Sequence, residues 1–311
     1  MISFRAFVVA AGAALALTSA NTTPATAQSS TATEKLNAYV GCINRLSSRA
    51  YDSQARYFSW APKSGPTGKE RIIYGLYTIY DTDDCKKSVE SANALEPRDA
   101  TLEEAASAYV SAVTTLGPLL KDADDYYTQE NYKDDKMAKG RALHPKLVAA
   151  WDAFSAADKS LRAGVDAIND KRKLEALKEI EAKEGKKTRY YVEVIMIDAK
   201  RVLRLQDTGK PDIDAITKAV ADLETSVKGF EETNAADGGK VSSFFTSNAK
   251  SVLVTSKQLM RRIRDKVPYS QGEKMMMQPG SGWMVEGSPA RLLRDYNQLV
   301  ESYNSIAKFG R

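Results

Sequence analysis

The chain has 311 residues and a formal net charge of +5, with 45 basic side chains, 40 acidic side chains and one histidine. So small an excess of positive charge over this length gives no support for nucleic-acid binding, and two cysteines with one histidine are too few for an ordinary zinc site. The length is near the limit at which one compact core stops growing, so we expect either one helical domain or one with a loosely separate C-terminal half.

The N-terminal segment has the order of a cleavable secretory signal. Arg5 precedes an apolar run over residues 7–17 that is too short to span a bilayer, and small polar residues lead on to Ala25-Thr26-Ala27. This order predicts a signal peptide over residues 1–27, cleavage near Ala27–Gln28 and a periplasmic mature protein over residues 28–311. No later apolar stretch reaches the roughly 18–20 residues that a spanning helix needs, so we expect no transmembrane segment in the mature chain.

Most of the mature chain repeats apolar side chains every three or four residues, which is the pattern of helices with one buried face. A first helix ends near Trp60, before a loop rich in proline and glycine over residues 62–68. The helices that we expect after it cover residues 69–80, 83–95, 101–127 and 134–184, a further segment that runs to Leu205 beyond a weak point at Gly185, and three that begin near Asp212, Ser242 and Pro289.

One segment, residues 190–197 (YYVEVIMI), has a strand-like composition. No second β-branched run is present for it to pair with, so we interpret it as a buried helical segment. The fold class that we expect is therefore all-α, an elongated antiparallel bundle of long helices with a possible subdivision near residue 209.

The two cysteines, Cys42 and Cys85, lie on either side of the loop at 62–68. In an oxidising compartment they can form a disulfide. Two buried free thiols fit the sequence equally well.

The densest group of tyrosines and carboxylates surrounds a predicted helix junction. Its members are Tyr126, Tyr127, Tyr132, Asp134, Asp135 and His144. Capping of the long helix that follows explains both aspartates, and a ligand pocket is the functional alternative. His144 has no second ligand at helical spacing, so we assign it no catalytic role.

A cluster of cations lies near the end of the helix that begins at Ser242. It consists of Arg261, Arg262, Arg264 and Lys266. Cations at this position complement the helix dipole and normally form a solvated face. A docking patch for anionic envelope polymers is the alternative interpretation.

A resemblance to a known family rests on two groups of residues. They are Tyr126-Tyr127, Tyr132, Asp134-Asp135, Gly140, Leu143-His144 and Phe154, with the opening Leu36-Asn37-Ala38-Tyr39 and Asn44. At these positions the chain resembles the YiiG-like proteins, exported bacterial helical proteins whose domain has no assigned function. The resemblance spans most of the mature chain and implies an all-α fold and an envelope location. It implies no activity, because the family has no agreed catalytic residues.

The function that we expect is therefore that of a non-enzymatic periplasmic protein without a cofactor. Its partner would be an unidentified envelope protein or anionic polymer, and not nucleic acid. A metal-binding protein or metal-dependent enzyme that uses residues 134–144 is the alternative.

Overall fold

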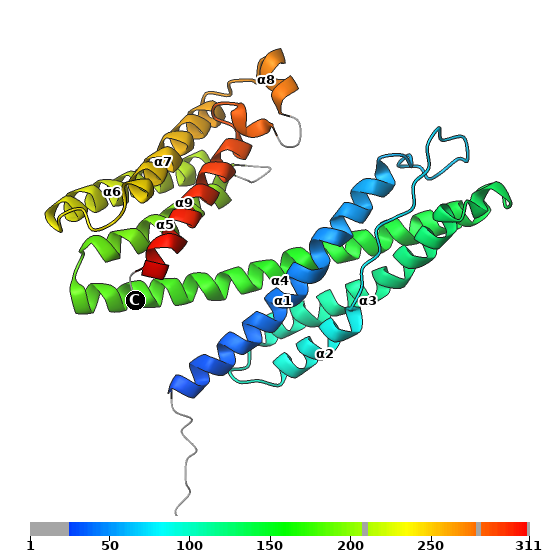
Figure 1. Ribbon diagram of the computed structural model, residues 1–311, viewed down its shortest axis with the longest axis horizontal. Helices are drawn as coiled ribbons and strands as arrows, with labels where there is room; N and C mark the ends of the chain where they lie inside the picture. The colour runs from blue at the N-terminus through cyan, green and yellow to red at the C-terminus, as the bar shows by residue number, and fades with distance from the viewer. Residues whose placement is uncertain (1–24, 207–210, 278–280, 310–311) are drawn as a thin grey trace, which may run out of the picture. The chain divides into compact units, whose positions relative to one another are not determined.

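The computed structural model describes residues 25–206, 211–277 and 281–309, and side chains from Thr31 to Ile306 outside the two gaps (Figure 1). Residues 1–24, which make up most of the predicted signal peptide, lie outside these ranges. So does the predicted subdivision point at residue 209.

The described residues are predominantly α-helical and contain no β-strand, which confirms the all-α prediction. The helices are α1 (Ala25–Phe58), α2 (Thr82–Asn93), α3 (Ala100–Thr128), α4 (Ala138–Glu184), α5 (Thr188–Gln206), α6 (Ile213–Ala236), α7 (Ser243–Arg264), α8 (Gln271–Met276) and α9 (Pro289–Phe309), with short 3-10 turns η1 (Asn131–Lys133) and η2 (Gly282–Met284). None of the described helices is long and apolar enough to cross a membrane.

The described residues form two compact units. The first ends at Asp166 and the second begins at Ala167, so the boundary falls inside α4. In the first unit, α1, α2, α3 and the first part of α4 share a core of fully buried side chains. These include Tyr39 and Leu46 of α1, Leu116 of α3, and Leu147 and Trp151 of α4.

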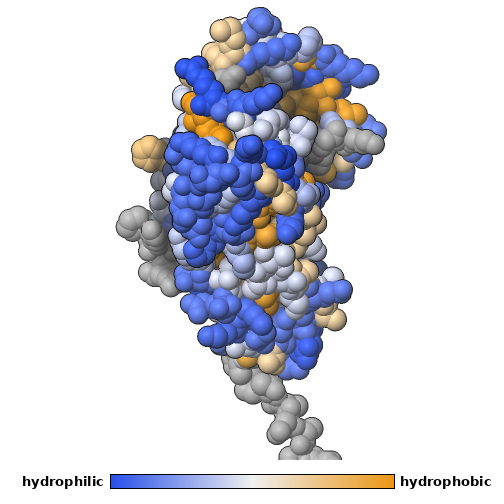
Figure 2. All heavy atoms as spheres, turned by 90° about the vertical axis from the view of Figure 1, so that its right-hand side faces the viewer, coloured by the Kyte–Doolittle hydropathy of each residue, from blue (hydrophilic) through white to orange (hydrophobic). Residues whose placement is uncertain are grey.

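The second unit packs α5, α6, α7 and α9 around its own core. Ile195, Leu223 and Leu299 are fully buried there, and the rings of Phe230 and Phe245 meet edge to face at 5.2 Å. Residues 190–197 lie within α5, which confirms the helical interpretation of that segment. Figure 2 shows one face of the molecule, on which hydrophilic residues predominate and apolar residues appear in small patches. This is expected, because the apolar faces of the helices are buried in the cores.

Several helices begin or end at residues whose types favour a helix terminus. Asp212 accepts hydrogen bonds from the backbone N–H groups of Asp214 and Ala215 at the start of α6, and the Ser288 hydroxyl accepts one from the N–H of Arg291 at the start of α9. Gly185 has φ 75° and separates α4 from α5, because glycine takes the left-handed conformation at little cost.

The helix predicted over residues 69–80 is wrong, because the segment is extended. Leu76 and Thr78 are buried while Tyr74 and Tyr77 are exposed, and this alternation is typical of an extended chain that packs one side on a core. Side chains bind its backbone in place of a neighbouring strand. Arg56 Nε donates to the Gly75 carbonyl (2.7 Å), Arg49 Nε to the Thr78 carbonyl (3.1 Å), and the Leu76 N–H donates to Asp124 Oδ1 (3.0 Å).

The approach of this segment to α3 requires glycine at one position. A Cβ atom at Gly75 would overlap Thr128 Oγ1 and Asp124 Oδ1. The missing side chain therefore lets the extended backbone lie directly against the helix.

A disulfide joins Cys42 of α1 to Cys85 of α2, which is one of the two states that the sequence left open, and the described residues contain no free cysteine. Both cysteines are fully buried. The bond closes the chain segment that holds the loop at 62–68 and the extended residues.

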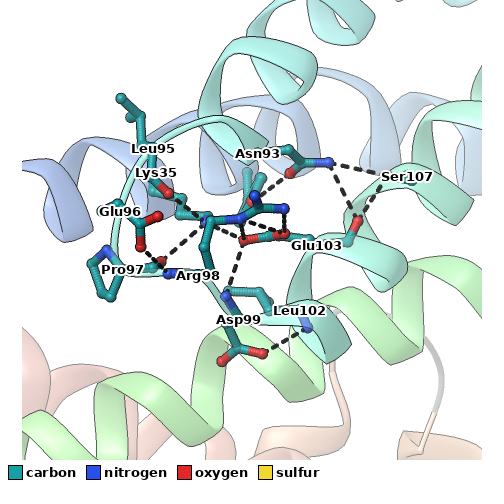
Figure 3. Close-up of polar contacts among 11 residues, drawn as sticks. Lys35, Asn93, Leu95, Glu96, Pro97, Arg98, Asp99, Leu102, Glu103 and Ser107 are labelled. Carbon is teal, nitrogen blue, oxygen red and sulfur yellow. Dashed lines mark hydrogen bonds and ion pairs between the residues drawn. The ribbon is translucent and has the colours of Figure 1, made fainter.

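A buried ion pair links α1 to the start of α3 (Figure 3). Lys35 Nζ donates to the Glu103 carboxylate and to the carbonyl oxygens of Leu95 (3.0 Å) and Pro97 (3.1 Å), so all three ammonium protons have acceptors. The Glu103 carboxylate also accepts from Arg98, with Nη2 at 2.6 Å, and from the Asp99 N–H at 3.0 Å. The hydrogen bonds from Arg98 and then from Lys35 hold the pKa of Glu103 well below its usual range.

Candidate functional site

The predicted site residues lie around the reversal of the chain between α3 and α4. Tyr126 and Tyr127 end α3, and Tyr132 lies in η1. Three residues near the turn, Glu130, Lys136 and Met137, have positive φ values of 57°, 53° and 67°. These left-handed conformations bring the tyrosines at the end of α3 close to the start of α4.

Asp135 caps α4, as one of the two interpretations predicts. Its carboxylate accepts from the backbone N–H groups of Ala138 (3.1 Å) and Lys139 (2.8 Å) and from the Tyr126 hydroxyl (2.7 Å). Because the Lys139 N–H bond stabilises the ionised form most, the pKa of Asp135 is lowered. Burial raises the pKa of Tyr126 to about 12, so this phenol is a neutral donor at pH 7.

Asp134 and Tyr132 do not join this arrangement. Asp134 is exposed, and its backbone N–H bonds to the Asn131 carbonyl (3.1 Å). The Tyr132 ring is half-buried and lies 6.5 Å from the ring of Tyr127. The structure therefore unites Tyr126 with Asp135 and leaves Asp134 at the surface.

His144 is bound through both ring nitrogens. Its Nδ1 lies 2.9 Å from the Tyr57 hydroxyl and its Nε2 lies 3.1 Å from the Lys63 carbonyl oxygen. A carbonyl only accepts, so Nε2 carries the proton and Nδ1 accepts from Tyr57. Gly65 (φ 102°) packs directly on this ring, since a Cβ there would lie 3.2 Å from His144 Cδ2.

The phenol that binds His144 belongs to a packed aromatic cluster. The Tyr57 ring lies 5.3 Å from Trp60, 5.5 Å from Trp151 and 6.3 Å from Tyr127. Burial raises the pKa of Tyr57 to about 12 and that of Tyr127 further. The phenols are neutral, and both nitrogens of the imidazole already form hydrogen bonds. The cluster therefore packs α1, α3 and α4 together and does not form an open pocket.

The described residues contain no group of three or more His, Cys, Asp or Glu side chains that could hold a metal ion. A metal at His144 would also have to displace Tyr57 or Lys63. The geometry of residues 134–144 therefore gives no specific support to metal chemistry.

The cation cluster at the end of α7 is largely bonded within the protein. Arg262 Nη2 binds Glu273 at 2.6 Å, and its guanidinium lies 4.4 Å from the centre of the Tyr269 ring. Arg264 forms an ion pair with Asp265 at 2.8 Å. These partners reduce the positive charge available to a polymer.

A groove of about 520 Å³ lies in the second unit, between the end of α4 (residues 167–184) and α5. We call it the α4–α5 groove. Its apolar floor and its charged rim come from these two helices, and its lining residues are Asp170, Lys173, Leu174, Leu177, Tyr190, Val194, Ile197, Asp198, Lys200, Arg201, Arg204 and Leu205. Its volume falls within the range of small-molecule sites.

Cations exceed carboxylates in this lining. Asp170 binds Lys200 (3.2 Å) and Arg204, while Arg201 binds Asp198 (2.5 Å) and Asp222 (3.1 Å). Partial burial acts to raise the pKa of Asp170, but Arg204 and Lys200 outweigh it and lower that pKa. Burial raises the pKa of Asp198, although its contacts with Ser226 and Arg201 act in the opposite direction.

None of the groove residues is among the site residues predicted from the sequence. The available signal was that α5 is apolar on two faces. Ile195 and Val202 point into the core, whereas Val194 and Ile197 line the groove. Apolar side chains on two sides of one helix suggest two packed faces, and the sequence pattern alone does not say that one of them is open.

Comparison with known proteins finds a family without an assigned role. A family model described as a protein of unknown function (DUF3829) matches residues 30–305. The uncharacterized protein YiiG of Escherichia coli (strain K12) is 42% identical over 278 residues, which cover 88% of this chain and 78% of that protein. No solved structure shows a significant match. The resemblance drawn from the sequence is confirmed.

Proposed function

The chain belongs to the DUF3829 family of proteins of unknown function, and from that premise we propose that it is a non-enzymatic binding protein of the bacterial cell envelope whose ligand site is the α4–α5 groove. The observation that carries the proposal is an apolar floor beside a rim on which cations outnumber carboxylates, although several of these cations already form ion pairs. The ligand class that fits this pairing is an amphipathic anion, with an apolar chain and one anionic head.

Two features support the envelope location. The N-terminal order of Arg5, an apolar run and Ala25-Thr26-Ala27 is that of an export signal. The buried Cys42–Cys85 disulfide is typical of proteins from oxidising compartments.

N-terminal sequencing tests the location. The protein recovered from the periplasmic fraction of a Gram-negative host should begin at or near Gln28, because the signal would be cleaved after Ala27. An unprocessed chain that stays in the cytosol would contradict export.

The geometry of the groove favours a chain-like apolar group. Four floor residues of α5, Tyr190, Val194, Ile197 and Leu205, follow one side of the helix over about 22 Å, taken as 15 steps of 1.5 Å. Leu174 faces them from α4 and is 48% exposed, so it still offers apolar surface to a ligand. Burial of such surface is the expected source of affinity.

A fluorescent fatty acid, dansylaminoundecanoic acid, is the probe for the groove. The wild-type protein should bind it saturably, and Leu174→Glu should raise the dissociation constant at least tenfold, about 1.4 kcal/mol. The substituted carboxylate would remove floor area and repel the anionic head. Fluorescence titration measures both effects, and the methyl ester of the probe should bind less tightly because it lacks the charge.

The matched control is Leu293→Glu in α9. Leu293 is 49% exposed and lies outside the groove, so this variant makes the same chemical change at the same exposure. Equal losses in the two variants, or no saturable binding to the wild type, would refute the groove as the ligand site.

A further inference from the structure

A second cavity of the second unit, about 290 Å³ in volume, lies between α7 and α9. Its lining is mainly cationic and hydroxylic, and consists of Ser247, Lys250, Ser251, Val254, Thr255, Gln258, Arg291, Arg294 and Asp295. It shares no residue with the α4–α5 groove. Some of these polar groups have partners within the protein, and others do not.

The one carboxylate among the described residues of this lining already accepts hydrogen bonds from neighbouring side chains. Asp295 is 3% exposed, and its Oδ2 accepts from the Thr255 hydroxyl at 2.6 Å. Its Oδ1 accepts from Arg294 Nε (3.1 Å) and Nη2 (2.9 Å). Arg294 Nη1 has no hydrogen bond to any described residue, so this guanidinium keeps a donor that Asp295 does not use.

Arg291 has no anionic partner within the described chain. Its side chain is half-buried, makes no ion pair or hydrogen bond with a described residue, and has its Nε buried without an acceptor. Lys250, by contrast, is paired with Glu231. A partly buried guanidinium without a counter-charge is unfavourable, and an anion in the cavity would remove that cost.

Gln258 adds an acceptor to the same cavity. Its Nε2 donates to the Glu286 carboxylate, which fixes the orientation of the amide because a carboxylate only accepts. The buried Gln258 Oε1 then has no donor among the described residues. A ligand that pairs with these free groups would need anionic oxygens to accept from Arg291 and Arg294, and a hydroxyl to donate to Gln258 Oε1.

We propose that the α7–α9 cavity binds a small phosphorylated molecule that carries a free hydroxyl. Planar guanidinium groups bind phosphate through paired, charge-assisted hydrogen bonds. The volume is slightly below the range of drug-sized pockets, which fits a molecule of a few carbon atoms and one phosphate. This site is independent of the α4–α5 groove, so either can fail without the other.

Isothermal titration calorimetry with glycerol 3-phosphate, inorganic phosphate and sulfate tests the proposal. Glycerol 3-phosphate should bind saturably, and sulfate, which has no hydroxyl at neutral pH, should bind at least tenfold more weakly. Inorganic phosphate is the comparison for the free ion. If it binds as tightly as glycerol 3-phosphate, the organic part of the proposed ligand is wrong.

Arg291→Gln should raise the dissociation constant for glycerol 3-phosphate at least tenfold. Arg261→Gln removes the same charge from an exposed position of α7 outside the cavity and should change it less than twofold. Thermal unfolding of both variants establishes that they fold. Absence of saturable binding to the wild type, or equal losses in both variants, would overturn the assignment.

Discussion

Glu103→Gln should lower the free energy of unfolding of the first unit by about 3–5 kcal/mol, the range observed when one partner of a buried ion pair is removed. The Lys35 side chain is 3% exposed, so its ammonium would stay buried and lose its counter-charge. Arg98 would also lose its carboxylate partner. The backbone acceptors on Leu95 and Pro97 cannot replace the missing negative charge.

Urea unfolding followed by tryptophan fluorescence measures this loss. In a Trp283→Phe background, the two tryptophans left, Trp60 and Trp151, both report on the first unit. Asp125→Asn is the matched control, because its ion pair with Lys121 lies on the same helix of the first unit, both side chains of the pair are exposed, and exposed pairs contribute about 0–1 kcal/mol. A similar, small change in both variants would show that the buried pair does not stabilise the unit.

The pH dependence of stability should differ between the wild type and Glu103→Gln. The folded-state pKa of Glu103 lies below the ordinary value of 4.5, so the unfolded state binds more protons in acid. The contribution of the carboxylate is therefore complete above about pH 5 and is lost as the pH falls through the lowered pKa. The gap between wild type and variant should narrow below pH 4.5, and a gap that stays constant would contradict the role of the charge.

The helices that were predictable from the sequence are those whose signals are local. In α6, the N-cap residue Asp212 is followed by apolar side chains at helical spacing. Three of these, Ile216, Leu223 and Phe230, are buried in the structure. Burial of one helical face produces that pattern directly. Asp135 likewise caps the helix that begins three residues later.

The extended segment at 69–80 was not predictable in this way. Its backbone groups are bound by Arg49, Arg56 and Asp124, which lie up to 48 residues away in sequence. Local periodicity contains no information about such partners. The α4–α5 groove was missed for a related reason, because whether the second apolar face of α5 is covered depends on how α4 packs beside it.

Replacement of Cys42 and Cys85 by alanine should lower the free energy of unfolding of the first unit by about 4 kcal/mol. The two residues are separated by 43 positions, and the chain-entropy relation gives this value for a loop of that length. The closed loop contains the extended residues 69–80, whose backbone depends on single side chains for its hydrogen bonds. Without the bond, the conformational entropy of the unfolded chain increases, and the folded state gains nothing that offsets this change.

Urea unfolding with and without a reductant separates the bond from the packing of the sulfur atoms. Reductant should destabilise the wild type and leave the double variant unchanged, because only the wild type has a bond to break. Any further loss in the variant relative to the reduced wild type measures the space left by two fully buried side chains. Equal stability of oxidised and reduced wild type would show that the link between α1 and α2 adds nothing, and that the packing of Tyr39, Leu46 and their neighbours is sufficient to hold the loop in place.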